Sequence, residues 1–391
     1  MMNSTKTKTN SYQYISALNN HGYEFKLSEL SDLVYVNCQG NGWKPLSDTL
    51  QSVINNTLRD DGFSRVNVAY DAIVAHAHRK RFHPIRDYLS MCKYDRAPHI
   101  NRLTKYFDNP DNNFSIWLRR WLIGAVQRVM ALGYQNRMLV MSGPQNIGKS
   151  KFVEWLVPEH LRTSHFFVGP ICPENKDQRL ALMDKWIWEV SELGSTTRKA
   201  DREALKYFLT LEQVTERKPY GRLPITKPAL TSFFGTVNDS GGLLSDPTGN
   251  RRFLFSQINS IDWKGYTNSI DVNQIWGEAY HAYLMGEAGD LLPDEQKMAN
   301  KVNKDYEIEN PLESVLVKHF DIDPSKSNWC TPSDVIREIC MDPVLGNYHV
   351  TPNMFYRQLA DIMTTFKVCR EKKRVTNYSN PVWCYLGVKR I

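Results

Sequence analysis

The sequence lacks the features on which membrane-spanning, disulfide-rich and zinc-ribbon proteins depend. No apolar run approaches the roughly 18 residues of a membrane helix, so we expect no membrane span. The seven cysteines are scattered, odd in number and never spaced as C-x-x-C. This pattern argues against both a disulfide framework and a zinc ribbon. Reduced thiols in a cytosol-like compartment are therefore expected.

The first residues also lack the apolar core of a signal peptide, and residues 1–11 are predicted to be a disordered tail. The full chain of 391 residues is 41% hydrophobic and 12% aromatic, which is typical of a globular protein. This length suits roughly two to four domains. The formal net charge of +7 permits a polyanionic partner without proving one.

One segment fits the phosphate-binding pattern G-x-x-x-x-G-K-[ST]. Its glycines let the backbone approach phosphate oxygens, and its N–H groups form a nest for them. Lys149 can reach the β- and γ-phosphates, and Ser150 can offer its hydroxyl to Mg²⁺. The flanking runs read as strand before and helix after. We therefore predict ATP and Mg²⁺ as ligands, with nucleotide contacts from Gly143, Pro144, Gln145, Asn146, Ile147, Gly148, Lys149, Ser150 and Lys151.

Two apolar runs beyond this loop end in polar residues. Lys185–Glu192 reads as a short strand ending in carboxylates, as a Walker B element requires. Glu189 suits the metal ligand and Glu192 the catalytic base, although these two roles could be exchanged. Leu230–Asn238 reads as another buried strand, and Asn238 at its end could position the attacking water.

Two basic segments accompany this region. Residues 212–228 read as an exposed hairpin that is either a solvated turn or a contact for single-stranded nucleic acid. The candidate contacts are Arg217, Lys218, Tyr220, Arg222 and Lys227. Arg251 and Arg252 enter a later strand. They are either surface charges or the source of an arginine finger for a neighbouring subunit's ATP.

The segment before the loop is predicted to be helical. Leu89–Tyr106 and Phe114–Leu132 both carry helical apolar spacing and are separated by a loop at 109–113. Arg119, Arg120 and Arg128 are expected to be ordinary exposed charges of the second helix.

The last 81 residues have the order helix, helix, basic hairpin, which is typical of a winged helix. Helices are predicted to begin at Thr331-Pro332 and Thr351-Pro352, each with threonine as N-cap. The concentration of cations in the hairpin favours DNA as its partner, while packing on a partner protein is the alternative. The predicted DNA contacts here are Arg357, Arg370, Lys372, Lys373 and Arg374.

Together these features resemble the virulence-associated E family of AAA+ ATPases, related to superfamily 3 helicases of phages, phage satellites and mobile islands. The resemblance rests on Phe82–Leu89, Gly143–Ser150, Trp186–Leu193, Arg217–Arg222, Gly235–Asp239 and Asp246–Phe253. It implies a homo-oligomeric ring, expected to be a hexamer, with ATP at subunit interfaces. Lys149, Ser150, Glu189, Glu192 and Asn238 would then form one half of the site. Arg251 or Arg252 of the next subunit would complete it, and the hairpin would meet DNA in the pore.

The resemblance predicts an ATP-dependent replicative DNA helicase or translocase, acting as a ring on single-stranded and forked DNA in the cytoplasm of a bacterial host. Two alternatives stay open: a replication initiator that uses ATP for origin assembly, and a regulatory or defence NTPase triggered by a partner. Larger relatives carry a primase module. Only about 80 residues precede the helical region here, without a metal-binding carboxylate pair or zinc cluster, so primer synthesis by this chain is not expected. A separate primase or other replication proteins are candidate partners.

The predicted fold class is α/β, with a P-loop AAA+ core of the superfamily 3 helicase type. The predicted divisions are a tail (1–11), a small α+β domain (12–84), a helical collar (85–135), the ATPase core (136–260), a helical linker (261–310) and the winged helix (311–391).

Overall fold

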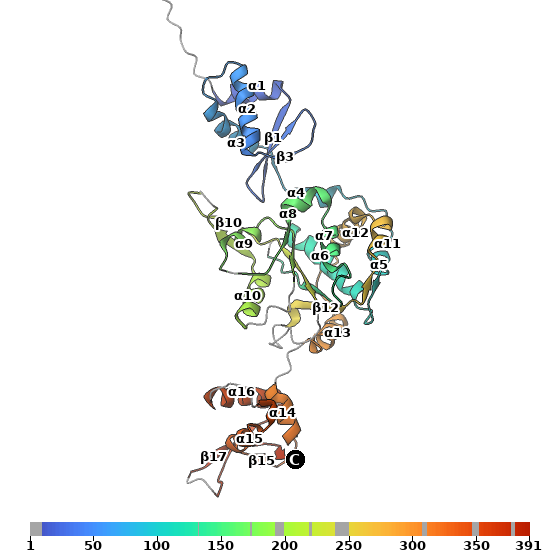
Figure 1. Ribbon diagram of the computed structural model, residues 1–391, viewed down its shortest axis with the longest axis vertical. Helices are drawn as coiled ribbons and strands as arrows, with labels where there is room; N and C mark the ends of the chain where they lie inside the picture. Colours follow the sequence, from blue (N-terminus) through green and yellow to red (C-terminus); the bar gives the residue numbers. More distant parts are fainter. Residues whose placement is uncertain are drawn as a thin grey trace, which may run out of the picture. The chain divides into compact units, whose positions relative to one another are not determined.

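The computed structural model describes residues 10–131, 133–172, 174–191, 199–218, 221–238, 250–306, 311–345, 352–376 and 380–391. Its contacts divide the chain into two compact units, Met1–Tyr306 and Glu307–Ile391 (Figure 1). Each unit is described by itself. Within the described residues, no helix combines the length and the apolar character needed to cross a bilayer.

The first unit begins with a small α+β layer. Its sheet has the order β3-β2-β1-β4, in which β4 is parallel to β1 and the other pairs are antiparallel. Alternate residues of β1 are buried beneath α1 and α3, as a half-buried strand requires. The elements are α1 (Ser11–Asn20), β1 (Tyr23–Ser28), β2 (Val34–Cys38), β3 (Lys44–Pro45), α2 (Asp48–Asp60), η1 (Val66–Val68), α3 (Ala69–Ala77) and β4 (Arg81–Phe82).

A five-stranded, wholly parallel sheet forms the centre of this unit, in the order β12-β6-β11-β8-β7. All five residues of β6 are buried, which explains why this strand appears in the sequence as an uninterrupted apolar run. Its strands are β6 (Met138–Ser142), β7 (Phe166–Val168), β8 (Ile187–Val190), β11 (Ser232–Val237) and β12 (Phe253–Gln257).

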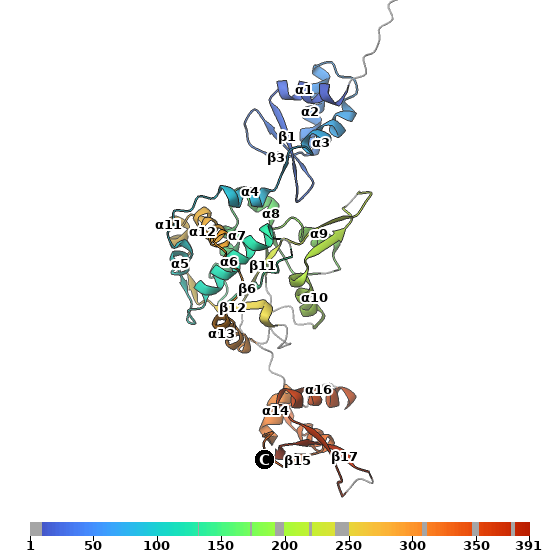
Figure 2. The ribbon, with the colours of Figure 1, turned by 180° about the vertical axis from the view of Figure 1, so that it is seen from behind.

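Helices cover both faces of this sheet, and alternate strand residues enter two different cores. Leu139 and Phe234 pack with α6, α7 and α12, whereas Val140 and Phe233 pack with α10. Figure 2 shows α6 alongside β6 and β11. The helices are α6 (Phe114–Met130), α7 (Lys149–Leu156), α8 (Glu159–His165), α9 (Lys176–Ala181), α10 (Lys199–Thr210), α11 (Trp263–Ser269), α12 (Val272–Leu284) and α13 (Pro293–Lys304).

The helix expected over 89–106 is wrong as a single element. The structure has α4 (Pro84–Met91) and α5 (His99–Thr104), separated by irregular chain. Pro98 supplies the physical reason, because proline has no N–H to donate and disfavours helical geometry at the residue before it. A short antiparallel pair, β5 (Phe107–Asp108) with β13 (Ser260–Ile261), then joins this region to the chain beyond the sheet.

The arginines of α6 are not exposed surface charges, so that expectation is also wrong. Arg120 and Arg128 are only 9% and 3% exposed. Arg119 pairs with Glu278 at 2.8 Å and with Glu287, whereas Arg120 pairs with Glu287 and Glu295. Arg128 donates to two backbone carbonyls, and its burial lowers the pKa of its guanidinium to about 10. Arg119 and Arg120 therefore fasten α6 to the chain that follows the sheet, whereas Arg128 holds it to the segments before β6 and β9.

We expect Glu278→Ala to lower the free energy of unfolding by about 2–3 kcal/mol. The Glu278 carboxylate is buried, accepts from the backbone N–H of Ile100 at 2.8 Å, and also pairs with Arg119. Its removal leaves the Ile100 N–H and the Nη1 group of Arg119 without their acceptor, while Arg119 keeps its pair with Glu287. The matched control is Asp294→Ala, because Asp294 forms a fully exposed pair with Lys297 and should cost less than about 0.5 kcal/mol. Equal effects in chemical denaturation would contradict this assignment.

The first unit ends on a side chain that reaches back to the central sheet. Tyr306 follows α13, is 4% exposed, and shares a hydrogen bond of 2.7 Å between its hydroxyl and that of Ser142 at the end of β6. Its ring also stacks on Phe255 of β12, with centroids 4.1 Å apart. Burial raises the pKa of the Tyr306 phenol, which therefore stays neutral.

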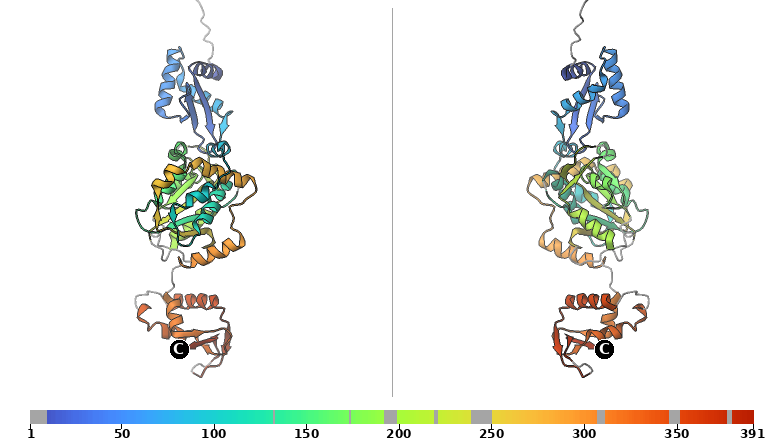
Figure 3. Two further views of the ribbon diagram at one scale, coloured as in Figure 1. Left: turned by 90° about the vertical axis from the view of Figure 1, so that its right-hand side faces the viewer. Right: turned by 90° about the vertical axis from the view of Figure 1, so that its left-hand side faces the viewer.

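In the described part of the second unit, α14, α15 and α16 pack on small antiparallel sheets, and Figure 3 shows this unit at its lower end in orange and red. Its three-stranded sheet has the order β15-β17-β16, and β14 pairs with β18. Leu316, Val335 and Leu359 bring the three helices to one core. The elements are α14 (Pro311–His319), β14 (Phe320–Ile322), β15 (Trp329–Cys330), α15 (Pro332–Ile339), η4 (Pro343–Leu345), α16 (Pro352–Thr365), β16 (Arg370–Lys373), β17 (Val382–Leu386) and β18 (Val388–Arg390).

Candidate functional site

The predicted phosphate loop connects the carboxyl end of β6 to the start of α7, so strand, loop and helix follow in the expected order. Gly148, the N-cap of α7, has a φ of +102°, which few residues other than glycine adopt. Gly143 has a φ of +151°, and a Cβ there would lie 1.9 Å from the carbonyl oxygen of Ile258. Both glycines are therefore required by the backbone itself.

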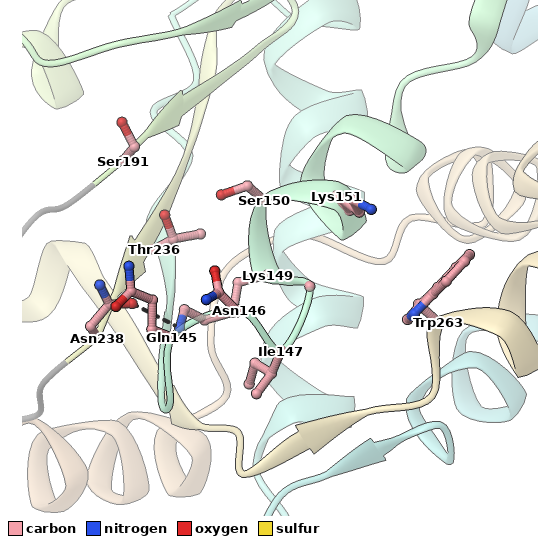
Figure 4. A pocket seen from close by; sticks show the side chains of 11 residues that line it. Gln145, Asn146, Ile147, Lys149, Ser150, Lys151, Ser191, Thr236, Asn238 and Trp263 are labelled. Carbon is pink, nitrogen blue, oxygen red and sulfur yellow. Dashed lines mark hydrogen bonds between the residues drawn. The ribbon is translucent and has the colours of Figure 1, made fainter.

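Lys149 lies inside the loop, 6% exposed, with its ammonium directed at oxygen atoms (Figure 4). Nζ donates to the carbonyls of Gly143 at 2.8 Å and Pro144 at 2.7 Å, and to Oδ1 of Asn238 at 3.2 Å. Partial burial lowers the pKa of Lys149 because the charged form loses hydration. An ammonium held in this way can exchange its carbonyl partners for phosphate oxygens.

Glu189 lies on β8 beside the loop, and its carboxylate is almost completely buried. The hydroxyl of Thr236, on the neighbouring strand β11, donates to it at 3.1 Å. Burial raises the pKa of the Glu189 carboxylate, and the Ser150 hydroxyl opposes this shift. A carboxylate next to a hydroxyl is the hard-oxygen donor set that Mg²⁺ prefers, so these residues fit that ion. Glu192, the other predicted carboxylate, lies outside the described residues.

A pocket of about 500 Å³ opens over this arrangement. The parallel sheet creates it, because the carboxyl ends of β6 and β11 meet at one edge. Beyond the predicted residues of the loop and Asn238, its lining contains Ser191, Thr236 and Trp263.

Sequence reasoning missed Trp263 entirely. This residue opens α11 and is 45% exposed, and the Lys151 ammonium lies 5.4 Å from its ring centroid. Figure 4 shows it on the side of the loop away from Asn238. No motif marks it, since it follows the sheet by several residues and enters the pocket only through the fold. Thr236 had a weak signal, because it lies two residues before Asn238 on a predicted strand.

Arg251 and Arg252 do not join this pocket. They form η3 (Asn250–Arg252), immediately before β12, whose first residue Phe253 pairs with Met138 at the start of β6. Since β12 and β6 are parallel, both arginines lie at the amino ends of these strands. The phosphate loop lies at the opposite, carboxyl ends. They line a separate hollow of about 260 Å³ together with Arg137 and Asp290.

The predicted DNA hairpin is β9 (Gln213–Glu216) with β10 (Ile225–Pro228), and two of its lysines are held by the α+β layer. Lys218 and Lys227 pair with Asp32, in the β1–β2 turn, at 2.9 and 2.7 Å. Lys227 also donates to the carbonyls of Glu29 and Leu30 at 2.7 Å each. Arg217 and Arg222 are exposed, and Tyr220 lies outside the described residues.

We expect Asp32→Ala to strengthen single-stranded DNA binding about fivefold if the hairpin contacts DNA as predicted. The substitution removes the carboxylate that neutralises Lys218 and Lys227, so their positive charges can attract phosphate although both ammonium groups keep bonds to backbone carbonyls. Fluorescence anisotropy with a labelled oligonucleotide measures the change. Asp60→Ala is the charge-matched control, because Asp60 is exposed at the end of α2. Equal gains in affinity for both variants would mean that the change in net charge, and not the two hairpin lysines, causes the effect.

The predicted cations of the second unit lie on two of its elements. Arg357 is exposed on α16, and Arg370, Lys372 and Lys373 follow one another along β16. Arg374, directly after that strand, is exposed as well.

The observed elements define a mixed α/β protein whose parallel sheet presents a phosphate-loop motif beside a buried carboxylate. The model of the virulence-associated protein E-like domain matches residues 89–308. The chain belongs to this family. No curated protein matches the sequence.

Solved structures give the same fold at low identity. The apo structure of the NrS-1 C-terminal region matches with a TM-score of 0.57 and 15% identity, covering 97% of this chain and 100% of that one. The A form apo structure of the same region matches with a TM-score of 0.55, 15% identity and the same coverage. At this identity the likeness establishes the shared fold alone.

Proposed function

We propose that this chain is an ATP-dependent DNA helicase or translocase of a phage or mobile genetic element. On this proposal residues 136–260 form an AAA+ P-loop ATPase core, and residues 311–391 form a DNA-binding winged helix. The observation that carries it is a single pocket lined by Lys149, Ser150 and Asn238, with Glu189 buried behind the lining residue Thr236. These residues come from three strands or their loops, separated by up to 89 positions in the chain.

The side chains of the pocket suit hydrolysis of a nucleoside triphosphate. Lys149 donates to the carbonyls of Gly143 and Pro144 at the start of the loop and would transfer these hydrogen bonds to the β- and γ-phosphates. Asn238, now bonded to Lys149, would be freed to orient the attacking water. Glu189 and Ser150 would hold Mg²⁺, which neutralises phosphate charge when bound. Glu192 keeps its predicted role as base, with exchange between the two carboxylates still open.

Trp263, which lines the pocket, would stack on the base of the nucleotide. If the phosphates bind at the N-terminus of α7, the sugar and base would extend along the side of the loop where Lys151 lies. The Lys151 ammonium lies over the Trp263 ring. A half-exposed indole offers a stacking face without selecting one base. The proposed site is therefore tolerant in its choice of base.

The position of Arg251 and Arg252 supports a ring. These arginines lie at the sheet edge opposite Lys149, so neither can reach a nucleotide bound in the same chain's pocket. In a head-to-tail ring, the surface of one subunit that carries Arg251 and Arg252 would face the pocket of the next subunit. An arginine of one subunit could then act on the ATP of its neighbour. The expected ring is a hexamer.

Strand displacement on a forked DNA duplex tests the proposal. Purified wild-type protein with ATP and Mg²⁺ should separate the strands, and omission of ATP should abolish separation. Two other results would contradict the proposal, and each would favour a different function. Tight, sequence-selective duplex binding without unwinding would indicate an initiator, whereas ATPase activity triggered only by a protein partner would indicate a regulatory switch.

A further inference from the structure

The second unit contains a pocket of about 570 Å³ between the start of α15, the exposed side of α16 and the β16–β17 hairpin. Two aromatic rings line it and remain open to solvent: Trp383 is 53% exposed and Tyr356 is 41% exposed. The hydroxyl of Tyr356 lies 3.3 Å from that of Ser333, which fixes its direction. Pockets of this size hold groups as large as a nucleotide.

Cations surround these rings. Arg357 and Arg370 line the pocket, and the Lys372 ammonium lies 5.3 Å from the Trp383 ring centroid. Arg370 is fixed by donating to the Tyr385 hydroxyl at 2.6 Å. Among the described residues, Arg357 and Lys372 form no ion pair with a carboxylate, so both charges are open to an anionic ligand.

We propose that this pocket binds an unpaired nucleotide of a single DNA strand, with its base stacked on Trp383 and its phosphate on Arg357 and Lys372. This inference rests on the proposed DNA-binding role of the second unit and specifies its ligand. Bases within a duplex have both faces covered by their neighbours, so an exposed indole offers stacking only to a base outside the helix. Cations alone would suit any phosphate backbone, whereas rings beside cations select the single-stranded form.

The position of Trp383 supplies an internal control. Lys372 pairs with Trp383 across the hairpin, whereas Trp329 pairs with Leu386. Because alternate residues of a strand face opposite sides, Trp329 and Trp383 lie on opposite faces of the same sheet. Trp329 is 40% exposed and also has a lysine over its ring, yet it does not line the pocket.

The test measures binding of the full chain to labelled oligothymidine and to a blunt duplex, by anisotropy and without nucleotide. Trp383→Ala should weaken oligothymidine binding about tenfold, since stacking contributes ~1–3 kcal/mol per base. Duplex binding should change less than twofold. Trp383→Phe should keep most of the affinity, and Trp329→Ala should bind like wild type. Equal losses for Trp383→Ala and Trp329→Ala, or equal losses on both DNAs, would overturn the proposal.

Crosslinking gives a readout that does not depend on how the variants fold. Wild-type protein irradiated with bromodeoxyuridine-substituted oligothymidine should form adducts at Trp383 or Tyr356, located by mass spectrometry. Adducts confined to the first unit would overturn the proposal, as would a polyglutamate peptide that competes equally well at matched ionic strength. Because no ATP is present, failure here leaves the ATPase proposal intact, and a failed unwinding assay leaves this binding result intact.

Discussion

Lys149→Ala is expected to lower ATP hydrolysis about 100- to 1000-fold, the usual effect of removing one electrostatic group from a transition-state site. Lys149 is the cation inside the loop, and its three donated hydrogen bonds already surround the place where phosphate would bind. Alanine removes this charge and adds no bulk. A coupled assay of phosphate release measures the rate, and a fluorescent ATP analogue separates lost binding from lost turnover.

The control for this substitution is Lys301→Ala, an exposed lysine on α13 of the same unit. It removes the same charge far along the chain from the loop and should leave turnover within about twofold of wild type. Thermal unfolding should be similar for both variants, because Gly143 and Pro144 keep carbonyls that water can reach. If Lys149→Ala hydrolyses ATP within about threefold of the wild-type rate, this pocket is not the site of hydrolysis.

Arg251→Ala or Arg252→Ala is expected to lower hydrolysis about 1000-fold while ATP binding persists, if that arginine acts in trans. Such a variant should regain activity when mixed with Lys149→Ala subunits. In randomly mixed rings, about one interface in four pairs an intact Lys149 with an intact arginine, which sets the expected recovery. This recovery is expected because η3 lies at the amino ends of β12 and β6, so neither arginine can reach the pocket of its own chain.

The mixing experiment has a control built from the same residues. A Lys149→Ala chain mixed with one carrying both substitutions has no intact Lys149 and should recover nothing. Recovery by the two single variants, without recovery here, assigns the arginine to the neighbouring subunit. If neither mixture recovers although mixed oligomers form, the arginine acts in its own chain or only stabilises the fold.

The loop and its flanking elements were predictable because local sequence determines them. The strand before Gly143 is an uninterrupted apolar run, and the glycines occur where the backbone needs positive φ. The family was also predicted correctly. The break after Met91 was missed because apolar spacing continues through a segment that Pro98 interrupts.

Other features depend on partners distant in the chain, which no local pattern reports. Arg119 is separated by 159 residues from Glu278. Lys227 is 198 residues from Glu29, whose carbonyl it contacts, so a basic hairpin that suggested DNA is partly neutralised within the protein. Trp263 likewise lines the pocket only through the three-dimensional arrangement of the fold. Such contacts convert a charge or a ring from a surface feature into part of a site.

Tyr306 has a mechanical consequence. It is the last residue of the first unit, and its hydroxyl is bonded to Ser142, which is covalently joined to Gly143 of the phosphate loop. Tension on the chain at this point would therefore be borne by the strand that presents the loop rather than by the surface of the domain. Tyr306→Phe keeps the stack on Phe255 but removes this hydrogen bond, so the end of the first unit would lose its polar link to the strand before the loop while the core stays packed.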